Sequence, residues 1–273
     1  MPDARPLLIT STADRLVAPE RATPGVTTFR SETTAEGQGW IGLARLEPGV
    51  DWDTFRTNLA ATVSDDHERI VKGMAALDTT ASLLGGAVIH VGRPAKFTAE
   101  LAPGPHVLFD YPSTAAPGGA PRYQMLTVDG PPEHATPQRP AGIIRSVRTV
   151  DGPRFEVLGT PTAGRPLRFA NAMPHPYVIE AVLFPVEPEV NGETLASYFA
   201  QFVDGSSEWP PDPPFDPATG TGTLPLSAGR ASAMSLSAAP GRYLLADWLK
   251  DPADGVRLVK RGHYLILELA EQS

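Results

Sequence analysis

Hydrophobic residues in this chain fall mostly into short segments separated by turn-forming residues. Each segment is apolar throughout or alternates between apolar and polar residues, and Gly, Pro, Asn or Asp stands near its ends. Such segments predict β-strands, because successive side chains of a strand point to opposite faces of a sheet. The predicted strands are residues 26–30, 40–46, 96–101, 106–111, 123–128, 155–158, 178–185, 233–236, 243–249 and 263–269.

Three other stretches have apolar residues at every third or fourth position, which predicts amphipathic helices. Asp51 and Asp53 stand where the first of these helices needs an N-terminal cap. We expect all three apolar stripes to pack against a sheet. Their apolar positions are Trp52, Phe55, Leu59 and Val63, then Ile70, Val71, Met74 and Leu77, and finally Leu195, Tyr198, Phe199 and Phe202.

An internal repeat connects the two ends of the chain. The sequence LAPGPHVLFDY at 101–111 returns as AAPGRYLLADW at 238–248, so that Asp110 and Asp247 are 137 residues apart. Two earlier segments, beginning at Thr23 and Trp40, have matches that begin 139 and 138 residues later. Several matches in the same order indicate a duplication.

The repeat predicts two domains and a linker. A length of 273 residues agrees with two domains, on a prior of about 100–200 residues for each. Residues 1–130 form the first repeat, the Pro-rich segment 131–142 is a linker, and residues 143–273 form the second repeat. The 25 Gly and 30 Pro favour many turns between short strands and argue against a helical bundle.

Composition excludes some classes of partner. The net charge is −8 and the sequence has no stripe of Lys and Arg, so we expect no binding to nucleic acid. No apolar run approaches the roughly 20 residues that span a bilayer, so we expect no membrane association. The chain has no Cys and no signal-peptide core after Met1, and we expect a cytoplasmic protein. The sequence leaves the oligomeric state open.

The order of these features resembles that of cupredoxin-like domains, twice over and across nearly the whole chain. The resemblance rests on a polar loop before an apolar strand, a helical insert, and the run Pro-Gly-x-Tyr-x-Leu-x-X-aromatic. A loop with Asp-Gly and a last strand follow that run. The resemblance implies a mainly β fold of two tandem cupredoxin-like β-sandwiches with short helical inserts.

The resemblance does not extend to the copper ligands. In the copper-binding members of the family, position X of the run is the cysteine ligand, whereas this chain has Asp110 and Asp247 there. A blue-copper site requires a thiolate, and the chain contains no cysteine, so such a site is excluded. Near the late histidine and methionine positions the chain has Arg122 and Met125 in the first repeat, and Leu258 and His263 in the second. We assign no metal ligand and expect no cofactor.

The resemblance also places three titratable residues at one end of the second repeat, where the early loop, the cysteine position and the last loop meet. These are His175, Asp247 and His263, and we predict them as catalytic residues. Asp247 shares one face of its strand with Tyr243 and Leu245, so loss of water is expected to raise its pKa and suit it to acid–base chemistry.

Six further residues are predicted to bind a substrate, because they lie at comparable places in the two repeats. Trp40, Asp110 and Tyr111 belong to the first repeat, and Tyr177, Glu180 and Trp248 to the second. The Pro-rich loop at 203–223 is long enough to cover the second site as a lid.

We therefore expect a copper-free enzyme that works without a cofactor on a small apolar molecule, as a cyclase, an isomerase or an eliminating enzyme of specialised biosynthesis. Two alternatives stay open. The chain can be a non-catalytic module that binds a small molecule or a protein, or a mononuclear, non-blue metal protein. Asp247 can also be structural, capping the loop that follows it or pairing with Lys250 or Arg257.

Overall fold

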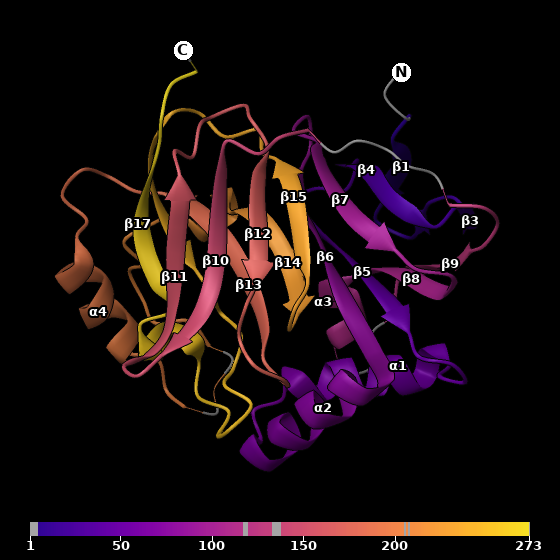
Figure 1. The fold of residues 1–273 in the computed structure, drawn as a ribbon. Helices are drawn as coiled ribbons and strands as arrows, with labels where there is room; N and C mark the ends of the chain where they lie inside the picture. The colour runs from indigo at the N-terminus through magenta and orange to yellow at the C-terminus, as the bar shows by residue number, and fades with distance from the viewer. Residues whose placement is uncertain (1–4, 117–119, 133–137, 205, 207, 273) are drawn as a thin grey trace.

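The computed structural model describes residues 5–116, 120–132, 138–204, 206 and 208–272. Its strands form two sheets that pack face to face around a common apolar core (Figure 1). The first sheet, in spatial order, contains β11 (Gly152–Gly159), β10 (Gly142–Thr149), β12 (Leu167–Asn171), β15 (Ala231–Ser235), β7 (Ala95–Leu101), β4 (Gly25–Thr33), β1 (Leu7–Ser11) and β2 (Leu16–Val17).

The second sheet has nine strands and forms the wall on which the candidate site is built. In spatial order they are β17 (Tyr264–Leu269), β16 (Gly241–Ala246), β13 (Val178–Pro185), β14 (Thr221–Ser227), β6 (Ala81–His90), β5 (Gln38–Leu46), β8 (Gly104–Asp110), β9 (Tyr123–Val128) and β3 (Arg21–Ala22). All ten predicted strands are present, with ends that differ by at most three residues.

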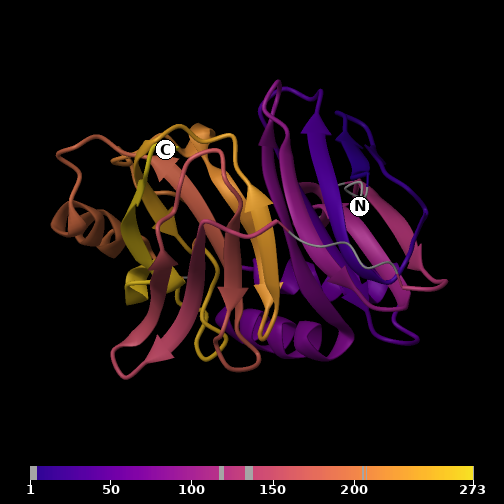
Figure 2. The same cartoon turned by 45° about the horizontal axis from the view of Figure 1, so that its top comes forward.

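Both sheets run through both halves of the chain, and the halves are paired in the same way. In the first sheet β1, β2, β4 and β7 repeat the pairing of β10, β11, β12 and β15, and β7 meets β15 at the centre. In the second sheet β5, β6, β8 and β9 correspond to β13, β14, β16 and β17, and β6 meets β14. The halves therefore lie side by side in an approximately twofold arrangement (Figure 2).

The predicted domain bounds stay a prediction. The two halves share their sheets and their core, so the strand pairing does not divide the chain at a particular residue. Of the predicted linker 131–142, residues 133–137 lie outside the described residues.

The helices cover the outer face of the second sheet. The three predicted helices are confirmed as α1 (Trp52–Thr62), α2 (His67–Thr80) and α4 (Gly192–Ala200), and the short helix α3 (Tyr111–Ala115) follows β8 directly. Asp51 caps α1 as expected, since its side chain accepts a hydrogen bond from the Thr54 N–H at 2.8 Å. Helix α4 packs on β13 and β16, and α1 and α2 pack on β5, β6 and β8. The 3₁₀ turns are η1 (Pro217–Thr219) and η2 (Leu258–Arg261).

This layering buries both faces of the second sheet. On β13, Ile179 and Leu183 point into the core between the sheets, whereas Val182 and Phe184 point outward beneath α4. Alternation along the strand places Glu180 on the outward side. None of the helices in the described part of the chain is both long and apolar enough to cross a bilayer.

Candidate functional site

A cavity of about 1210 Å³ lies on the outer face of the second sheet, where the two halves meet. We call it the shared cavity, because both halves contribute to its wall. Four of the six predicted substrate-binding residues line it: Trp40 and Tyr111 from the first half, and Glu180 and Trp248 from the second. Its other lining residues are Ala60, Val63, Ser64, Asp65, Asp66, Arg69, Pro112, Ala115, Ala116, Trp209, Leu249 and Arg257.

Two glycines show how the halves correspond at this cavity. A Cβ on Gly86 would lie 2.0 Å from the carbonyl oxygen of Ile41, and a Cβ on Gly222 would lie 2.1 Å from that of Ala181. Both glycines adopt a backbone conformation with positive φ, 154° and 156°. Gly86 pairs with Gly42, which follows Ile41, and Gly222 pairs with Val182, which follows Ala181. Ile41 and Ala181 are therefore equivalent positions, 140 residues apart, which corrects the sequence match of Trp40 with Val178 by two residues.

The residues that precede them, Trp40 and Glu180, are equivalent as well, and both line the shared cavity. Tyr111 and Trp248 form a second equivalent pair, since they follow Asp110 and Asp247 of the sequence repeat. The cavity wall is thus built from corresponding positions, but three of the four side chains are aromatic and the fourth is an acid.

Glu180 is the buried acid of this wall, and its side chain has little contact with water. The residue is 5% exposed, and its Oε1 accepts a hydrogen bond from the backbone N–H of Trp248 at 3.3 Å. Burial raises the pKa of Glu180 to about 8, and the negative charge of Asp247 acts in the same direction. The Trp248 N–H and the charge of Arg257 act in the opposite direction. Glu180 is therefore protonated at neutral pH and can donate a proton.

Asp247 and His263, two of the three predicted catalytic residues, form a close pair. The His263 Nδ1 lies 2.9 Å from the Asp247 Oδ2, and neither residue is exposed. The imidazole ring also stacks on Phe155, with 4.0 Å between ring centroids. Burial raises the pKa of Asp247, while His263 and the N–H groups of Leu249 and Glu180 lower it.

This pair lies in the core and not in a hollow, which corrects the expected position. Asp247 does share a face with Tyr243 and Leu245, as the alternation predicted, and that face belongs to the core between the sheets. Trp248 points to the other side and reaches the shared cavity. Asp247 therefore acts on Glu180 through the sheet, by its charge, and does not line the cavity.

His175, the third predicted catalytic residue, is in a different place. Its Nδ1 lies 2.7 Å from the Asp78 Oδ1, near the end of α2, and its side chain is 69% exposed. Across the described residues, His175 shares no hydrogen bond or ion pair with Asp247 or His263. The expected convergence of three catalytic side chains is therefore limited to two, because the loop around His175 turns toward α2.

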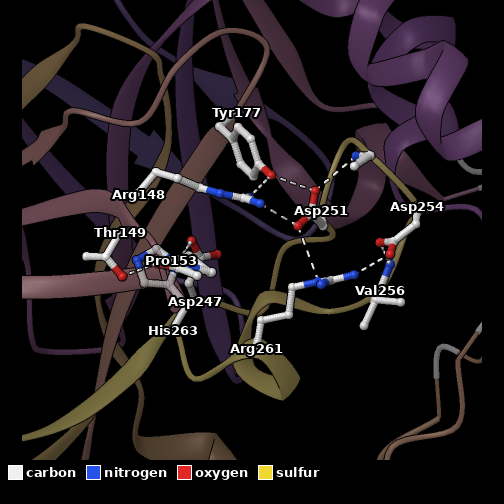
Figure 3. A network of polar contacts seen from close by, with 12 residues as sticks. Arg148, Thr149, Pro153, Tyr177, Asp247, Asp251, Asp254, Val256, Arg261 and His263 are labelled. Atoms are coloured by element: carbon white, nitrogen blue, oxygen red, sulfur yellow. Dashed lines mark hydrogen bonds and ion pairs between the residues drawn. The ribbon is translucent and has the colours of Figure 1, made fainter.

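Tyr177 is likewise outside the shared cavity, in a buried polar network. Its hydroxyl donates to the Asp251 Oδ1 at 2.8 Å and contacts Arg148 (Figure 3). Arg148 and Arg261 lie 3.6 and 3.2 Å from the Asp251 Oδ2. Tyr177 belongs to the core cluster, so its ring faces inward and away from the cavity. The network ties β10, the start of β13 and the last loop together.

Asp110 is the counterpart of Asp247 in the first half, and it is also buried away from the cavity. Its Oδ2 lies 2.9 Å from Arg122, and its Oδ1 accepts a hydrogen bond from the Ser113 N–H at 3.0 Å. The backbone N–H of Asp110 bonds to the Arg122 carbonyl, as that of Asp247 bonds to the His263 carbonyl. Both acids therefore stabilise the chain where a strand ends, which supports the structural alternative for them.

These residues do not fit the copper site of a cupredoxin. In the first half, the Arg122 cation occupies the place beside Asp110 that a metal ion would need. In the second half, Asp247 and His263 supply two donors, and His175 is elsewhere. Within the described residues, no three or more His, Cys, Asp or Glu side chains are grouped to hold a metal ion. We derive no step through a metal.

The other twelve lining residues were not predicted as site residues, and two of them, Trp209 and Arg257, bear most on the cavity's chemistry. Trp209 lies in the Pro-rich loop that we expected to act as a lid, and its indole lies 4.6 Å from that of Trp248, measured between ring centroids. Arg257 follows the Asp-Gly turn of the last loop, and it donates hydrogen bonds to the carbonyls of Trp248 and Ser206 at 3.3 and 3.1 Å. A tryptophan in the Pro-rich loop is the signal that could have found Trp209.

Comparisons with known proteins bear on the fold alone. No family model and no curated protein matches the chain. Among solved structures, auracyanin B is 19% identical, with 50% of this chain and 93% of that one covered and a TM-score of 0.29. A multicopper oxidase is 11% identical over 98% of this chain and 88% of its own, with a TM-score of 0.27.

A copper-containing nitrite reductase from Thermus scotoductus SA-01 is 11% identical, with 98% of this chain and 61% of that one covered and a TM-score of 0.27. At these TM-scores the likeness carries no argument about ligand or reaction. The chain is a mainly β protein with structural neighbours among cupredoxins and multicopper oxidases, and it lacks the cysteine of a blue-copper centre.

Proposed function

We propose that the chain is a copper-free enzyme that uses acid–base chemistry, without a cofactor, on a small and largely apolar molecule in the shared cavity. The observation that carries this proposal is Glu180, a buried carboxyl with a raised pKa of about 8, set in an aromatic wall. A carboxyl whose pKa lies near the working pH can both give and take a proton.

The chemistry follows from the two states of this carboxyl. Protonated Glu180 transfers its proton to a double bond or a carbonyl oxygen of the bound molecule. The resulting carboxylate accepts a hydrogen bond from the Trp248 N–H and is attracted by the positive charge of Arg257. It is otherwise poorly solvated. It therefore takes a proton from a neighbouring carbon, which restores the acid. No proton is gained or lost overall, so the reaction is an isomerisation, or a cyclisation when a ring closes between the two transfers.

The aromatic wall supports the same chemistry. Trp40, Tyr111 and Trp248 line the cavity. The face of an aromatic ring beside a protonated substrate stabilises the positive charge that develops on it. Asp247 is a positioning residue in this scheme. Its charge raises the pKa of Glu180 from the far side of the sheet.

A second candidate is binding in the same cavity without turnover. The Asp247–His263 pair has a structural counterpart in Asp110–Arg122, so neither acid needs a catalytic role to explain its position. A binding module would use Glu180 as a hydrogen-bond donor only.

Deuterium exchange distinguishes the two candidates. The purified protein is incubated in D₂O with an organic-solvent extract of the cells that make it, and the small molecules are compared by mass spectrometry. The proposal expects at least one compound to gain deuterium or to change its retention time with the wild-type protein, and to remain unchanged with Glu180→Gln.

Two controls keep this test specific. Arg168→Gln alters an exposed residue of the first sheet, and it is expected to behave as the wild type. Treatment with EDTA should leave the conversion intact, whereas loss on chelation and recovery with added metal would favour the metal-protein alternative. Equal conversion by wild type and Glu180→Gln, or no conversion by either, would overturn the proposed reaction.

A further inference from the structure

The shared cavity contains more positive charge near its wall than a neutral, apolar ligand requires. Arg257 lines the cavity, and Lys250 stands directly opposite it in an isolated antiparallel bridge. Side chains of directly opposed residues point to the same face of a pair, and like charges in this position repel each other. Two neighbouring cations in a partly buried place cost free energy unless an anion or hydrogen bonds compensate for their burial.

Backbone carbonyls are the hydrogen-bond partners of these cations. The Lys250 Nζ donates to the carbonyl oxygen of Ser64, a cavity-lining residue, at 2.5 Å, although Lys250 is only 5% exposed. Arg257 donates to the carbonyls of Trp248 and Ser206. In the part of the chain that the structure describes, neither cation forms an ion pair with a carboxylate. These contacts use two of the five N–H donors of the guanidinium.

The acids around this place do not neutralise it. Asp65 is exposed at the rim, and its charge acts on both cations from a distance. Asp66 is occupied as the cap of α2, where it accepts the Arg69 N–H at 3.0 Å. Burial lowers the pKa of Lys250, as does the charge of Arg257, whereas Asp65 raises it. Burial also lowers the pKa of Arg257, whereas Glu180 and Asp65 raise it. Burial further keeps Glu180 uncharged at neutral pH.

We infer that the ligand of the shared cavity is a flat, unsaturated or aromatic carboxylate, whose anionic group binds at Arg257 and Lys250 while its apolar body lies against the tryptophans and reaches Glu180. This inference rests on the proposed function and specifies its substrate class. A single negative charge fits, because Asp65 already offsets part of the positive charge. Arg257 supplies the planar fork that carboxylates prefer, and Lys250 adds a point charge behind it.

Matched probes test the inference without knowledge of the natural substrate. 2-Naphthoate and 2-naphthamide have nearly the same size and shape, but only the first is charged at pH 7. Their binding is followed by quenching of the fluorescence of Trp40, Trp209 and Trp248. We expect 2-naphthoate to bind about tenfold more tightly, as one charge-assisted contact in a partly dry site allows.

Variants assign the preference to the cation pair. In Arg257→Gln the two Kd values should become equal within about twofold, with the Kd of 2-naphthamide little changed. Lys250→Met should reduce the preference in part, and Arg168→Gln, on the far sheet, should retain it. Thermal unfolding of each variant shows that it is folded.

The outcomes separate this inference from the proposed function. Equal Kd values in the wild type, or a preference that survives in the Arg257→Gln, Lys250→Met double variant, would overturn the carboxylate assignment alone. Tighter binding of 2-naphthyl phosphate than of 2-naphthoate, by about tenfold or more, would replace the carboxylate by a phosphate. Failure of both naphthalene probes to bind at millimolar concentration would remove the cavity as a ligand site, and the proposed function with it.

Discussion

Trp40 and Glu180 occupy equivalent positions in the two halves of the chain, and both line the same cavity. A duplicated fold has here produced one asymmetric site: the first half supplies an aromatic surface, and the second half supplies an acid at the same position. The pairing of β6 with β14 brings the two positions together. The site therefore belongs to the junction of the halves and not to either half.

The first prediction concerns the effect of pH on stability. The pKa of Glu180 is about 8 in the folded chain, against an ordinary value of 4.5. Between these values the folded state holds a proton that the unfolded state releases, so the free energy of unfolding falls as the pH rises. Glu180→Gln removes this dependence. Its stability relative to the wild type should increase by on the order of a few kcal/mol from about pH 5 to about pH 9.

Urea denaturation at several pH values measures this difference. Asp53→Asn, at an exposed position in the first turn of α1, serves as a control that should not reproduce the trend. Parallel stability curves for the wild type and Glu180→Gln would show that Glu180 titrates normally.

The second prediction concerns Asp247 as a positioning residue. Asp247→Asn keeps the shape of the side chain and removes the negative charge that raises the pKa of Glu180. The pKa of Glu180 should fall, but it should stay above 4.5 because burial is the larger cause. The pH dependence of 2-naphthamide binding, compared with that of the wild type, measures the shift. An unchanged pH dependence would mean that Asp247 has no influence across the sheet.

Much of the fold could be predicted from local patterns, and the exceptions have physical reasons. Strand β14 was missed because it contains Gly222 and Pro225, which are unfavourable in strands. Strand β6 was missed because it follows α2 directly and carries Gly85 and Gly86 among uniformly apolar residues. These two strands join the halves within the second sheet, although neither lines the shared cavity. The other strands that were missed are β1, β2, β3, β10 and β12.

The candidate site was harder to predict than the fold. Alternation correctly separated Asp247 from Trp248 directly after β16, but both faces of this strand are apolar. Hydrophobicity therefore could not tell which face meets the opposing sheet and which lies beneath helices. The equivalence of Trp40 and Glu180 was also hidden, because an aromatic residue and an acid share no sequence signal and the register appears only in the strand pairs.

The third prediction tests the close approach at the two equivalent glycines. A methyl group at Gly86 or Gly222 would lie 2.0 or 2.1 Å from a carbonyl oxygen, far inside van der Waals contact, and both residues have positive φ. Gly86→Ala and Gly222→Ala should each lower the free energy of unfolding by about 3 kcal/mol or more. Gly192→Ala is the matched control, since a Cβ there meets nothing within 4 Å and helix α4 gains a better helix former. Chemical denaturation that ranks Gly192→Ala with the other two variants would contradict the described strand pairing.

The fourth prediction separates the shared cavity from the remaining aromatic surface. Trp40→Ala removes one wall of the cavity, and it should weaken the binding of neutral 2-naphthamide by about tenfold, since a stacked aromatic contact and its buried area are lost. Trp52→Ala removes a comparable ring that stacks on Tyr123 at 3.8 Å between centroids and does not line the cavity. The Kd of 2-naphthamide should therefore change little in that variant. Calorimetric titration of both variants measures the two constants, and similar losses in both would mean that the probe binds outside the cavity.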